Sequence, residues 1–271
     1  MYIKRQNNSD EVLRVAQVIR KLNDGGIESV VYNYYRSIDR SKIQFDVIYQ
    51  SDSIAEPSIE LKNMGMNFYK VTPYYTNPFK YIAELVDIFK TNRYRIVHSN
   101  MNTISIFVLF AAFIARIPVR ICHNHSVPGG NEHFRNVFKY IFRPIVTVFA
   151  TDYFACSEKA AIWMFGKSAY KKGRVKIIHN AIDFKKYGKG KKCNTDELII
   201  GTVGRLTYAK NYAFLIEIFC LLLEIYPNAK LLIVGDGELK DKLISYCEEL
   251  GVSNKVSFTG WKRMQRDIIK Q

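Results

Sequence analysis

Short apolar runs alternate with longer helical patterns along almost the whole chain. The runs are rich in β-branched and aromatic residues, which predicts strands, and apolar residues recur at helical spacing between most of them. In the first two thirds of the chain the predicted strands are 13–19, 45–49, 96–98, 119–122, 153–156 and 175–178. Because strands that alternate with helices form parallel sheets, the pattern predicts an α/β fold whose sheet is covered on both faces.

A second α/β unit follows a charged, glycine-containing segment. The stretch KKYGKGKK at 185–192 has little to bury, which is typical of a linker. Beyond it we predict strands 198–203, 230–234 and 256–259 and helices 211–226 and 238–250. These elements amount to about half of a doubly wound domain, whose usual size is about 100–150 residues. We therefore expect a complete domain over 1–184, a basic linker over 185–194 and a partial domain over 195–271.

The charge of the chain narrows the choice of partners. Its 271 residues include 40 Lys or Arg and 25 Asp or Glu, a net charge of +15. This favours anionic partners such as nucleic acid, an anionic membrane or phosphorylated substrates. The basic residues are spread along the chain and no nucleic-acid-binding motif is present, so we expect no nucleic-acid partner.

The cysteines and the apolar segments predict a cytoplasmic protein. Five widely spaced cysteines, an odd number, are typical of reduced thiols. The N-terminal segment has no apolar stretch of the kind a secretory signal needs. The most apolar segment, 104–117, is shorter than the roughly 20 residues that cross a bilayer, so we interpret it as a buried helix.

Two glycine-containing turns follow predicted strands and could bind phosphate. Gly25 and Gly26 precede a helix, where backbone amides can approach an anion closely, although a tight turn without a ligand has the same pattern. Arg205 and Lys210 follow the strand 198–203 at the start of another helix, and two cations there could neutralise a diphosphate without a metal. Solvated surface charge is the alternative for both cations.

Two further sequence patterns could indicate a metal site and a lipid-binding helix. Cys122, His123 and His125 lie close in sequence, but no second ligand pair appears at zinc-site spacing, so we predict no metal site. The stretch 133–149 predicts an amphipathic helix of basic and aromatic residues. Such a helix can lie on anionic lipid, or it can be a core-packing helix with a solvated charged stripe. The charged residues of this helix are Arg135, Lys139 and Arg143, and the apolar ones on its other sides are Phe134, Phe138, Ile141 and Phe142.

Eight segments, in this order and spacing, resemble the retaining glycosyltransferase family 4, which includes bacterial enzymes of capsule, exopolysaccharide and lipid-linked sugar synthesis. The segments are GGIE at 25–28, RIVHSN at 95–100, RICHNHS at 120–126, FACSE at 154–158, IIHNAID at 177–183, VGRLTYAKN at 203–211, LLIVGDGELK at 231–240 and VSFTGW at 256–261. The resemblance extends over most of the chain.

The resemblance implies a GT-B fold with two Rossmann-like lobes, the first binding the acceptor and the second a nucleotide-diphosphate sugar. Arg205 and Lys210 match the family's diphosphate-binding pair, and Gly25 and Gly26 match its loop facing donor and acceptor phosphates. His125 matches the active-site histidine, which would hydrogen-bond the sugar or acceptor at the reacting centre. Further cleft candidates are His98, Asn100, His123, Asn180, Gly235, Gly237 and Trp261.

The resemblance also implies the partners of the reaction. We expect a nucleotide-sugar donor, no metal or other cofactor, and a glycan or polyprenyl-phosphate-linked acceptor. A lipid-linked acceptor would place the protein at the inner face of the plasma membrane, where it would contact an anionic surface.

One family feature is absent from the sequence. The donor lobe normally continues with a motif of two glutamates separated by seven residues, and nothing after Trp261 supplies it. We therefore expect residues 1–271 alone to show little or no sugar transfer. The alternative hypothesis is a non-catalytic member of the same scaffold that binds an acceptor or a partner.

Overall fold

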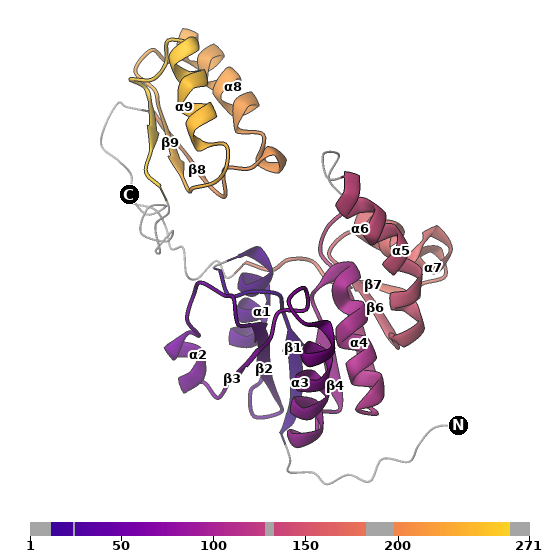
Figure 1. Cartoon of the computed structure of the whole chain (residues 1–271). Helices are drawn as coiled ribbons and strands as arrows, with labels where there is room; N and C mark the ends of the chain where they lie inside the picture. The colour runs from indigo at the N-terminus through magenta and orange to yellow at the C-terminus, as the bar shows by residue number, and fades with distance from the viewer. Residues whose placement is uncertain (1–11, 24, 128–132, 183–197, 261–271) are drawn as a thin grey trace. The chain divides into compact units, whose positions relative to one another are not determined.

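The computed structural model describes residues 12–23, 25–127, 133–182 and 198–260, which fall into two compact units. Unit 1 comprises Met1–Ile182 and unit 2 comprises Asp183–Gln271. Figure 1 shows both, and each is described by itself below. The predicted linker 185–194 and Trp261 lie outside the described residues.

Unit 1 is built on a seven-stranded sheet with the order β3-β2-β1-β4-β5-β6-β7, and all neighbouring strands run parallel. The predicted α/β fold class is confirmed. The strands are β1 Leu13–Val18, β2 Ile43–Gln50, β3 Asn67–Val71, β4 Ile96–Ser99, β5 Val119–Asn124, β6 Asp152–Ala155 and β7 Val175–Ile177. The chain order reverses between β1 and β4, and open α/β sheets bind ligands at the carboxyl ends of the strands beside such a reversal point.

Helices cover both faces of this sheet. On one face α1 (Gly26–Ser37) and α2 (Ile59–Asn63) bury Val31, Tyr35 and Leu61 against β1 and β2. On the other face α3 (Pro78–Thr91) and α4 (Ser105–Ile114), which lie side by side, bury a second apolar cluster. Beyond them, α5 (His133–Phe149), α6 (Glu158–Phe165) and α7 (Lys167–Lys171) accompany β5–β7.

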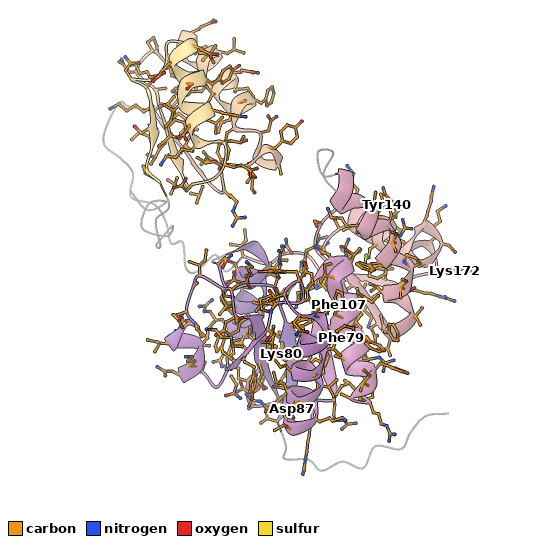
Figure 2. All side chains as sticks on the ribbon, in the orientation of Figure 1. Phe79, Lys80, Asp87, Phe107, Tyr140 and Lys172 are labelled. Atoms are coloured by element: carbon orange, nitrogen blue, oxygen red, sulfur yellow. The ribbon has the colours of Figure 1, made fainter. Side chains whose placement is uncertain are left out.

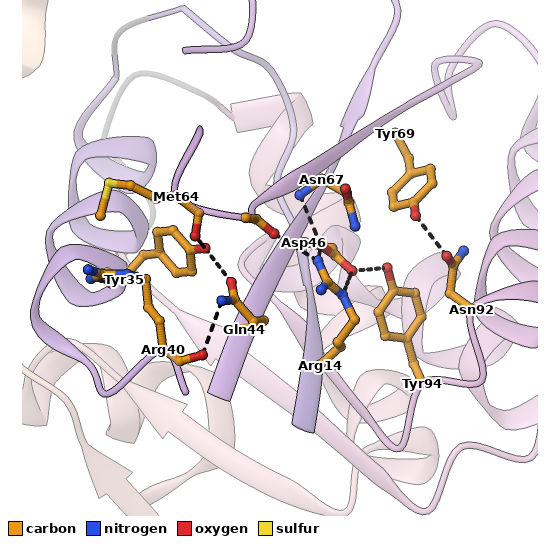
Figure 3. Close-up of polar contacts among 11 residues, drawn as sticks. Arg14, Tyr35, Arg40, Gln44, Asp46, Met64, Asn67, Tyr69, Asn92 and Tyr94 are labelled. Atoms are coloured by element: carbon orange, nitrogen blue, oxygen red, sulfur yellow. Dashed lines mark hydrogen bonds and ion pairs between the residues drawn. The ribbon is translucent and has the colours of Figure 1, made fainter. Parts of the chain in front are cut away.

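A buried charge network fixes the strands on the β2 side of this reversal point (Figure 3). Asp46 on β2 is fully buried and accepts hydrogen bonds from Arg14 Nε at 2.8 Å, Tyr94 Oη at 2.6 Å and the amide of Asn67 at 3.0 Å. Arg14 also donates to the carbonyl of Gly65 at 3.0 Å. A buried charge is tolerated only when it is paired and hydrogen-bonded, so this network ties β1, β2, β3 and the turn before β4 together.

Unit 2 contains a three-stranded parallel sheet, with β8 (Ile199–Val203), β9 (Lys230–Val234) and β10 (Val256–Phe258) in the order β10-β9-β8. Helices α8 (Tyr212–Ile225) and α9 (Lys240–Glu249) pack against it in one apolar core. These five elements match the predicted strands and helices to within two residues at each end.

The described residues contain no helix with the length and apolar character needed to cross a membrane. Four cysteines are free thiols, namely Cys122, Cys156, Cys220 and Cys247, and Cys193 lies outside the described residues.

Candidate functional site

In unit 1, polar side chains gather at the carboxyl ends of β1, β4 and β5, next to the point where the strand order reverses. Gln17 on β1 and Asn100 after β4 are buried, with exposed fractions of 3% and 2%. The amide of Asn100 donates to the carbonyl of Val18 at 2.9 Å, and Asn100 Nδ2 donates to Gln17 Oε1 at 3.0 Å. Open α/β sheets bind ligands at such reversal points, so these residues mark the carboxyl ends of β1, β4 and β5 as the candidate site of unit 1.

Asn100 fixes the orientation and tautomer of His125. Asn100 Nδ2 faces two oxygens, Gln17 Oε1 and the carbonyl of His98, the latter at 3.4 Å. Asn100 Oδ1 therefore faces His125 Nε2 at 2.9 Å and must accept its hydrogen. The proton of neutral His125 thus lies on Nε2, which leaves Nδ1 as a bare lone pair. Nδ1 is buried and meets no hydrogen-bond partner among the described residues.

The backbone around His125 is held from two sides. Asn102 adopts a left-handed conformation, with φ of 52°, which asparagine tolerates better than most residues. Its Oδ1 accepts a hydrogen bond from the amide of His125 at 2.7 Å, and its Nδ2 donates to Ser126 Oγ at 3.3 Å. On the other side Cys156 Sγ donates to the carbonyl of His125 at 3.3 Å. Strained backbone that crosslinks two strand ends in this way is common at ligand sites.

Two more histidines lie beneath His125. The rings of His123 and His125 are 3.9 Å apart between centroids, and His123 Nδ1 shares a hydrogen bond of 3.0 Å with His98 Nε2. Phe154 on β6 meets both His98 and His123 edge-on, with ring centroids 5.5 and 5.9 Å away. The structure thus brings together four of the predicted cleft residues: His98, Asn100, His123 and His125.

Burial lowers the pKa of all three imidazoles because it disfavours the charged form. The pKa falls to about 4 for His125, to about 3 for His98 and to about 2 for His123, with the neighbouring histidines lowering the last two further. All three rings are therefore neutral at neutral pH. His125 Nδ1 is unpartnered but buried, so it can accept a hydrogen bond only where its surroundings open to admit a donor, and the neutral ring carries no cationic charge to offer.

The glycine turn before α1 is held by a buried carboxylate. Glu28 Oε2 accepts hydrogen bonds from the amides of Asn23 and Gly25, both at 2.8 Å, and Glu28 is only 5% exposed. Gly25 has φ of −86°, which any residue can adopt, and a Cβ added to Gly26 would meet nothing within 4 Å. The fold of unit 1 therefore does not itself require glycine at position 26, and the missing side chain leaves the start of α1 accessible to a ligand.

In unit 2 the loop that follows β8 presents two cations. Arg205 and Lys210 are exposed, and within 198–260 neither forms a hydrogen bond or ion pair through its side chain. The side chain of Lys210 passes over Gly204, where its Cε lies 3.7 Å from the position a Cβ would occupy. Asn211 then adopts a left-handed conformation and gives α8 no side-chain cap, so the helix begins with uncapped amides beside these cations.

Gly235 and Gly237 support that loop from below. A Cβ on Gly235, where φ is 146°, would lie 1.9 Å from the carbonyl oxygen of Gly204. A Cβ on Gly237 would lie 2.4 Å from the carbonyl oxygen of Leu206, whose amide donates to the carbonyl of Asp236 at 3.0 Å. Both glycines are thus required for close backbone packing under Arg205, and a contact with a ligand stays a prediction for them.

The other predicted residues are less informative. Asn180 is exposed after β7, and the carbonyls on either side of it accept hydrogen bonds from Tyr34 at 2.8 Å and Asn33 at 3.0 Å, which attaches this segment to α1. In the described part of the chain, no three His, Cys, Asp or Glu side chains are grouped so that they could hold a metal ion.

Sequence reasoning missed Gln17 and Asn102, which orient the predicted residues. Gln17 had a signal, because it is an uncharged polar residue near the carboxyl end of the strand LRVAQV, whose last four residues are otherwise apolar. Asn102 had none, because its role depends on a left-handed backbone and on β5 lying next to β4.

Comparison with known proteins gives two family matches. The family described as Glycosyltransferase Family 4 matches residues 24–186, and the family described as Glycosyl transferases group 1 matches residues 183–270. The putative glycosyltransferase EpsF of Bacillus subtilis is 29% identical over 276 residues, covering 95% of this chain and 71% of EpsF.

A second relative and a solved structure extend the comparison. The Escherichia coli UDP-Gal:alpha-D-GlcNAc-diphosphoundecaprenol alpha-1,3-galactosyltransferase is 25% identical over 211 residues, covering 70% of this chain and 53% of that enzyme. The crystal structure of Anabaena HepE in complex with UDP and glucose superposes with a TM-score of 0.71 at 19% identity, covering 95% of this chain and 72% of HepE. At this identity the likeness shows the fold alone, a GT-B arrangement of the kind predicted.

Proposed function

Because the chain belongs to glycosyltransferase family 4, we propose that it binds a nucleotide-diphosphate sugar in unit 2 and serves in the transfer of that sugar to a lipid-linked acceptor. The reaction would be retaining, would need no metal and would contribute to surface polysaccharide synthesis. The protein would work in the cytoplasm, at the inner face of the plasma membrane.

The observation that carries the proposal is the loop Gly204–Asn211. Two exposed cations flank an uncapped helix start, and within 198–260 no acidic side chain pairs with either of them. A diphosphate fits this arrangement, since Arg205 and Lys210 supply charge-assisted hydrogen bonds and the first amides of α8 supply further donors. A donor bound in this way would need no Mg²⁺, because the protein's own cations would offset the charge that develops on the departing nucleotide.

The polar residues at the carboxyl ends of β1, β4 and β5 in unit 1 support the second half of the proposal. The buried Nδ1 of neutral His125 would become accessible when the acceptor binds and would then accept a hydrogen bond from a sugar or acceptor hydroxyl, and the open start of α1 at Gly26 would face a phosphate. The printed name of the E. coli relative specifies a diphosphoundecaprenol-linked sugar. An acceptor of that class would bring a phosphate, a hydroxyl and a lipid to unit 1.

The test is calorimetric titration of the chain with UDP, GDP and their sugars in the presence of a chelator. We expect one nucleoside diphosphate to bind, and we expect Arg205→Ala and Lys210→Ala each to weaken binding by about 10-fold to 100-fold, since a charge-assisted hydrogen bond contributes about 1.5–3 kcal/mol. Lys242→Ala is the matched control, because it removes an exposed lysine of α9.

The outcomes are distinct. If no nucleoside diphosphate binds, or if the control variant weakens binding as much as the two loop variants, the donor-binding proposal fails. If binding needs Mg²⁺, the metal-independent part of the proposal fails. If the chain binds donor and acceptor but transfers no sugar between them, the alternative of a non-catalytic binding protein is favoured.

A further inference from the structure

We propose that Lys21, Asp52 and Tyr75 form a sugar-binding subsite at the carboxyl ends of β1, β2 and β3, and that this subsite holds a sugar residue of the acceptor other than the one that reacts. The inference rests on the proposed transfer to an acceptor held by unit 1. It adds the class of that acceptor, which is an oligosaccharide and not a single sugar.

The three side chains come from three loops that the parallel sheet brings together. Lys21 follows β1, Asp52 follows β2 and Tyr75 follows β3, and the strand order β3-β2-β1 places these strand ends side by side. Lys21 Nζ forms an ion pair with Asp52 Oδ2, and Tyr75 Oη donates a hydrogen bond to the same oxygen. The ammonium of Lys21 lies 6.0 Å from the ring centroid of Tyr75. Each member of this group, the Tyr75 cluster, thus contacts the other two.

The ring of Tyr75 is exposed and yet held in place. Its exposed fraction is 53%, although its hydroxyl is bonded to Asp52. The ring of Tyr74 meets it edge-on, with centroids 5.4 Å apart, and Tyr74 stacks in turn on Phe107 of α4 at 5.7 Å. A ring that is already fixed loses little conformational freedom when a ligand covers it, so Tyr75 is preorganised for stacking.

A second aromatic side chain is exposed at the same edge of the sheet. Phe79 is 82% exposed in the first turn of α3, four residues after Tyr75. Because α3 begins beyond the carboxyl end of β3, this turn lies at the edge that carries the Tyr75 cluster. Figure 2 shows Phe79 and Lys80 toward this end of α3 and Asp87 toward the other end. Aromatic rings beside hydrogen-bonding groups suit a ligand that has both apolar and polar parts.

The charges of the cluster favour an uncharged ligand. The hydrogen bond with Asp52 raises the pKa of Lys21. Burial opposes the ionisation of Asp52, but hydrogen bonds from Lys21 and Tyr75 lower its pKa. Both groups are therefore ionised at neutral pH and offset each other, which leaves little net attraction for an anion or a cation.

The hydrogen-bonding capacity that remains matches a sugar. An ammonium has three hydrogens, so Lys21, whose side chain is 27% exposed, can donate to a ligand as well as to Asp52. Tyr75 Oη donates to Asp52 and keeps lone pairs that can accept a hydrogen bond. Sugar hydroxyls both donate and accept, and the C–H groups on one face of a pyranose ring can stack on an aromatic ring.

The Tyr75 cluster shares a loop with the glycine turn at which we propose that the acceptor phosphate binds. Lys21 and Gly25 are four residues apart, so their Cα atoms lie within roughly 14 Å of each other. The amide of Leu22 donates to Ser53 Oγ at 3.0 Å, which ties this loop to the loop that carries Asp52. An oligosaccharide whose phosphate lies at the glycine turn can therefore place a further ring on Tyr75.

The test is NMR titration of the intact chain with methyl glycosides of glucose, galactose, N-acetylglucosamine and N-acetylgalactosamine and with disaccharides of these sugars. We expect at least one disaccharide to bind, and to bind more tightly than its component monosaccharides. Tyr75→Ala should weaken its binding by about 10-fold and remove this advantage, whereas Tyr75→Phe, which keeps the ring, should weaken it by less than about 3-fold. Tyr140→Ala is the matched control, because Tyr140 is 56% exposed on α5, a different helix of unit 1 (Figure 2).

Four results would overturn the inference: no disaccharide binds, Tyr75→Ala keeps the advantage of the disaccharide, Tyr140→Ala weakens binding as much as Tyr75→Ala, or Tyr75→Phe weakens it as much as Tyr75→Ala. The last result would make Tyr75 a brace for Asp52 and not a stacking surface. Circular dichroism checks the fold of each variant.

Titration of the same preparations with UDP and GDP separates this inference from the donor-binding proposal. A chain that binds a nucleoside diphosphate and no disaccharide would overturn the sugar subsite alone. A chain that binds a disaccharide through Tyr75 and no nucleoside diphosphate would support the subsite and contradict the donor-binding proposal.

Discussion

Acidification from pH 7 to pH 5 should destabilise unit 1 through its three neutral histidines. In the unfolded chain a histidine has a pKa near 6.5, whereas in the folded unit the pKa is about 4 for His125, about 3 for His98 and about 2 for His123. Between these values the unfolded chain binds protons that the folded unit excludes. Stability therefore rises with pH in this range and is lost as pH falls below about 6.5.

The expected loss of unfolding free energy follows from the difference between the pKa values of the histidines in the unfolded and folded states. At pH 5 each unfolded histidine lies about 1.5 pH units below its pKa, and one unit corresponds to about 1.4 kcal/mol, so each contributes about 2 kcal/mol. The three rings, of which His123 is buried and His98 and His125 are half-buried, together give an upper value of about 6 kcal/mol. Carboxylates contribute mainly at lower pH, because their reference pKa values lie near 4. The range from pH 7 to pH 5 thus isolates the histidines.

The assay is hydrogen exchange of backbone amides in β4 and β5, which reports the unfolding free energy of unit 1 in the intact chain. His123→Phe is the informative variant, since it keeps an aromatic ring in the buried position and removes one titrating group. We expect it to reduce the pH dependence by about a third. An unfolding free energy that is equal at pH 7 and pH 5, or a His123→Phe variant that keeps the full pH dependence, would show that these histidines do not set the pH dependence of unit 1.

Two further predictions concern stability. Asp46→Ala should lower the unfolding free energy of unit 1 by about 3 kcal/mol, because it leaves the Arg14 guanidinium and the Tyr94 hydroxyl without their acceptor. Urea denaturation would measure this loss, and a loss below about 1 kcal/mol would contradict the prediction. Gly235→Ala should unfold unit 2 or lower its unfolding free energy by at least about 3 kcal/mol, because the added Cβ would overlap the Gly204 carbonyl. Gly26→Ala should change the stability of unit 1 by less than about 1 kcal/mol, because the added Cβ meets open space. Thermal melts that showed equal effects of the two substitutions would contradict this prediction.

The sequence predicted most of the fold because strands of a covered parallel sheet are nearly continuous apolar runs. The strand β3 was missed for the opposite reason. It lies at the sheet edge with one neighbour, and only Val71 of its five residues is buried, so its pattern resembles that of a loop. Edge strands carry a weak signal wherever they bury only part of one face.

The candidate site could be predicted only at residues whose side chains can themselves be charged or take part in catalysis. The histidines and the loop cations stand out in the sequence, and the family resemblance gave them roles. The roles of Gln17 and Asn102, which orient Asn100 and His125, could not be predicted in this way. These roles depend on a strand pairing and on a left-handed backbone, neither of which a local sequence pattern encodes. The packing role of Gly235 likewise depends on the approach of the loop after β8.

Amide chemical shifts during a UDP titration test most directly whether unit 2 binds a nucleoside diphosphate at the loop after β8. We expect the largest shifts within residues 204–211 and the first turn of α8, and we expect them to disappear in Arg205→Ala, Lys210→Ala protein. Shifts confined to the groove between α8 and α9, which Leu239, Asp241 and Tyr246 line, would contradict it. So would shifts that persist unchanged in the double variant.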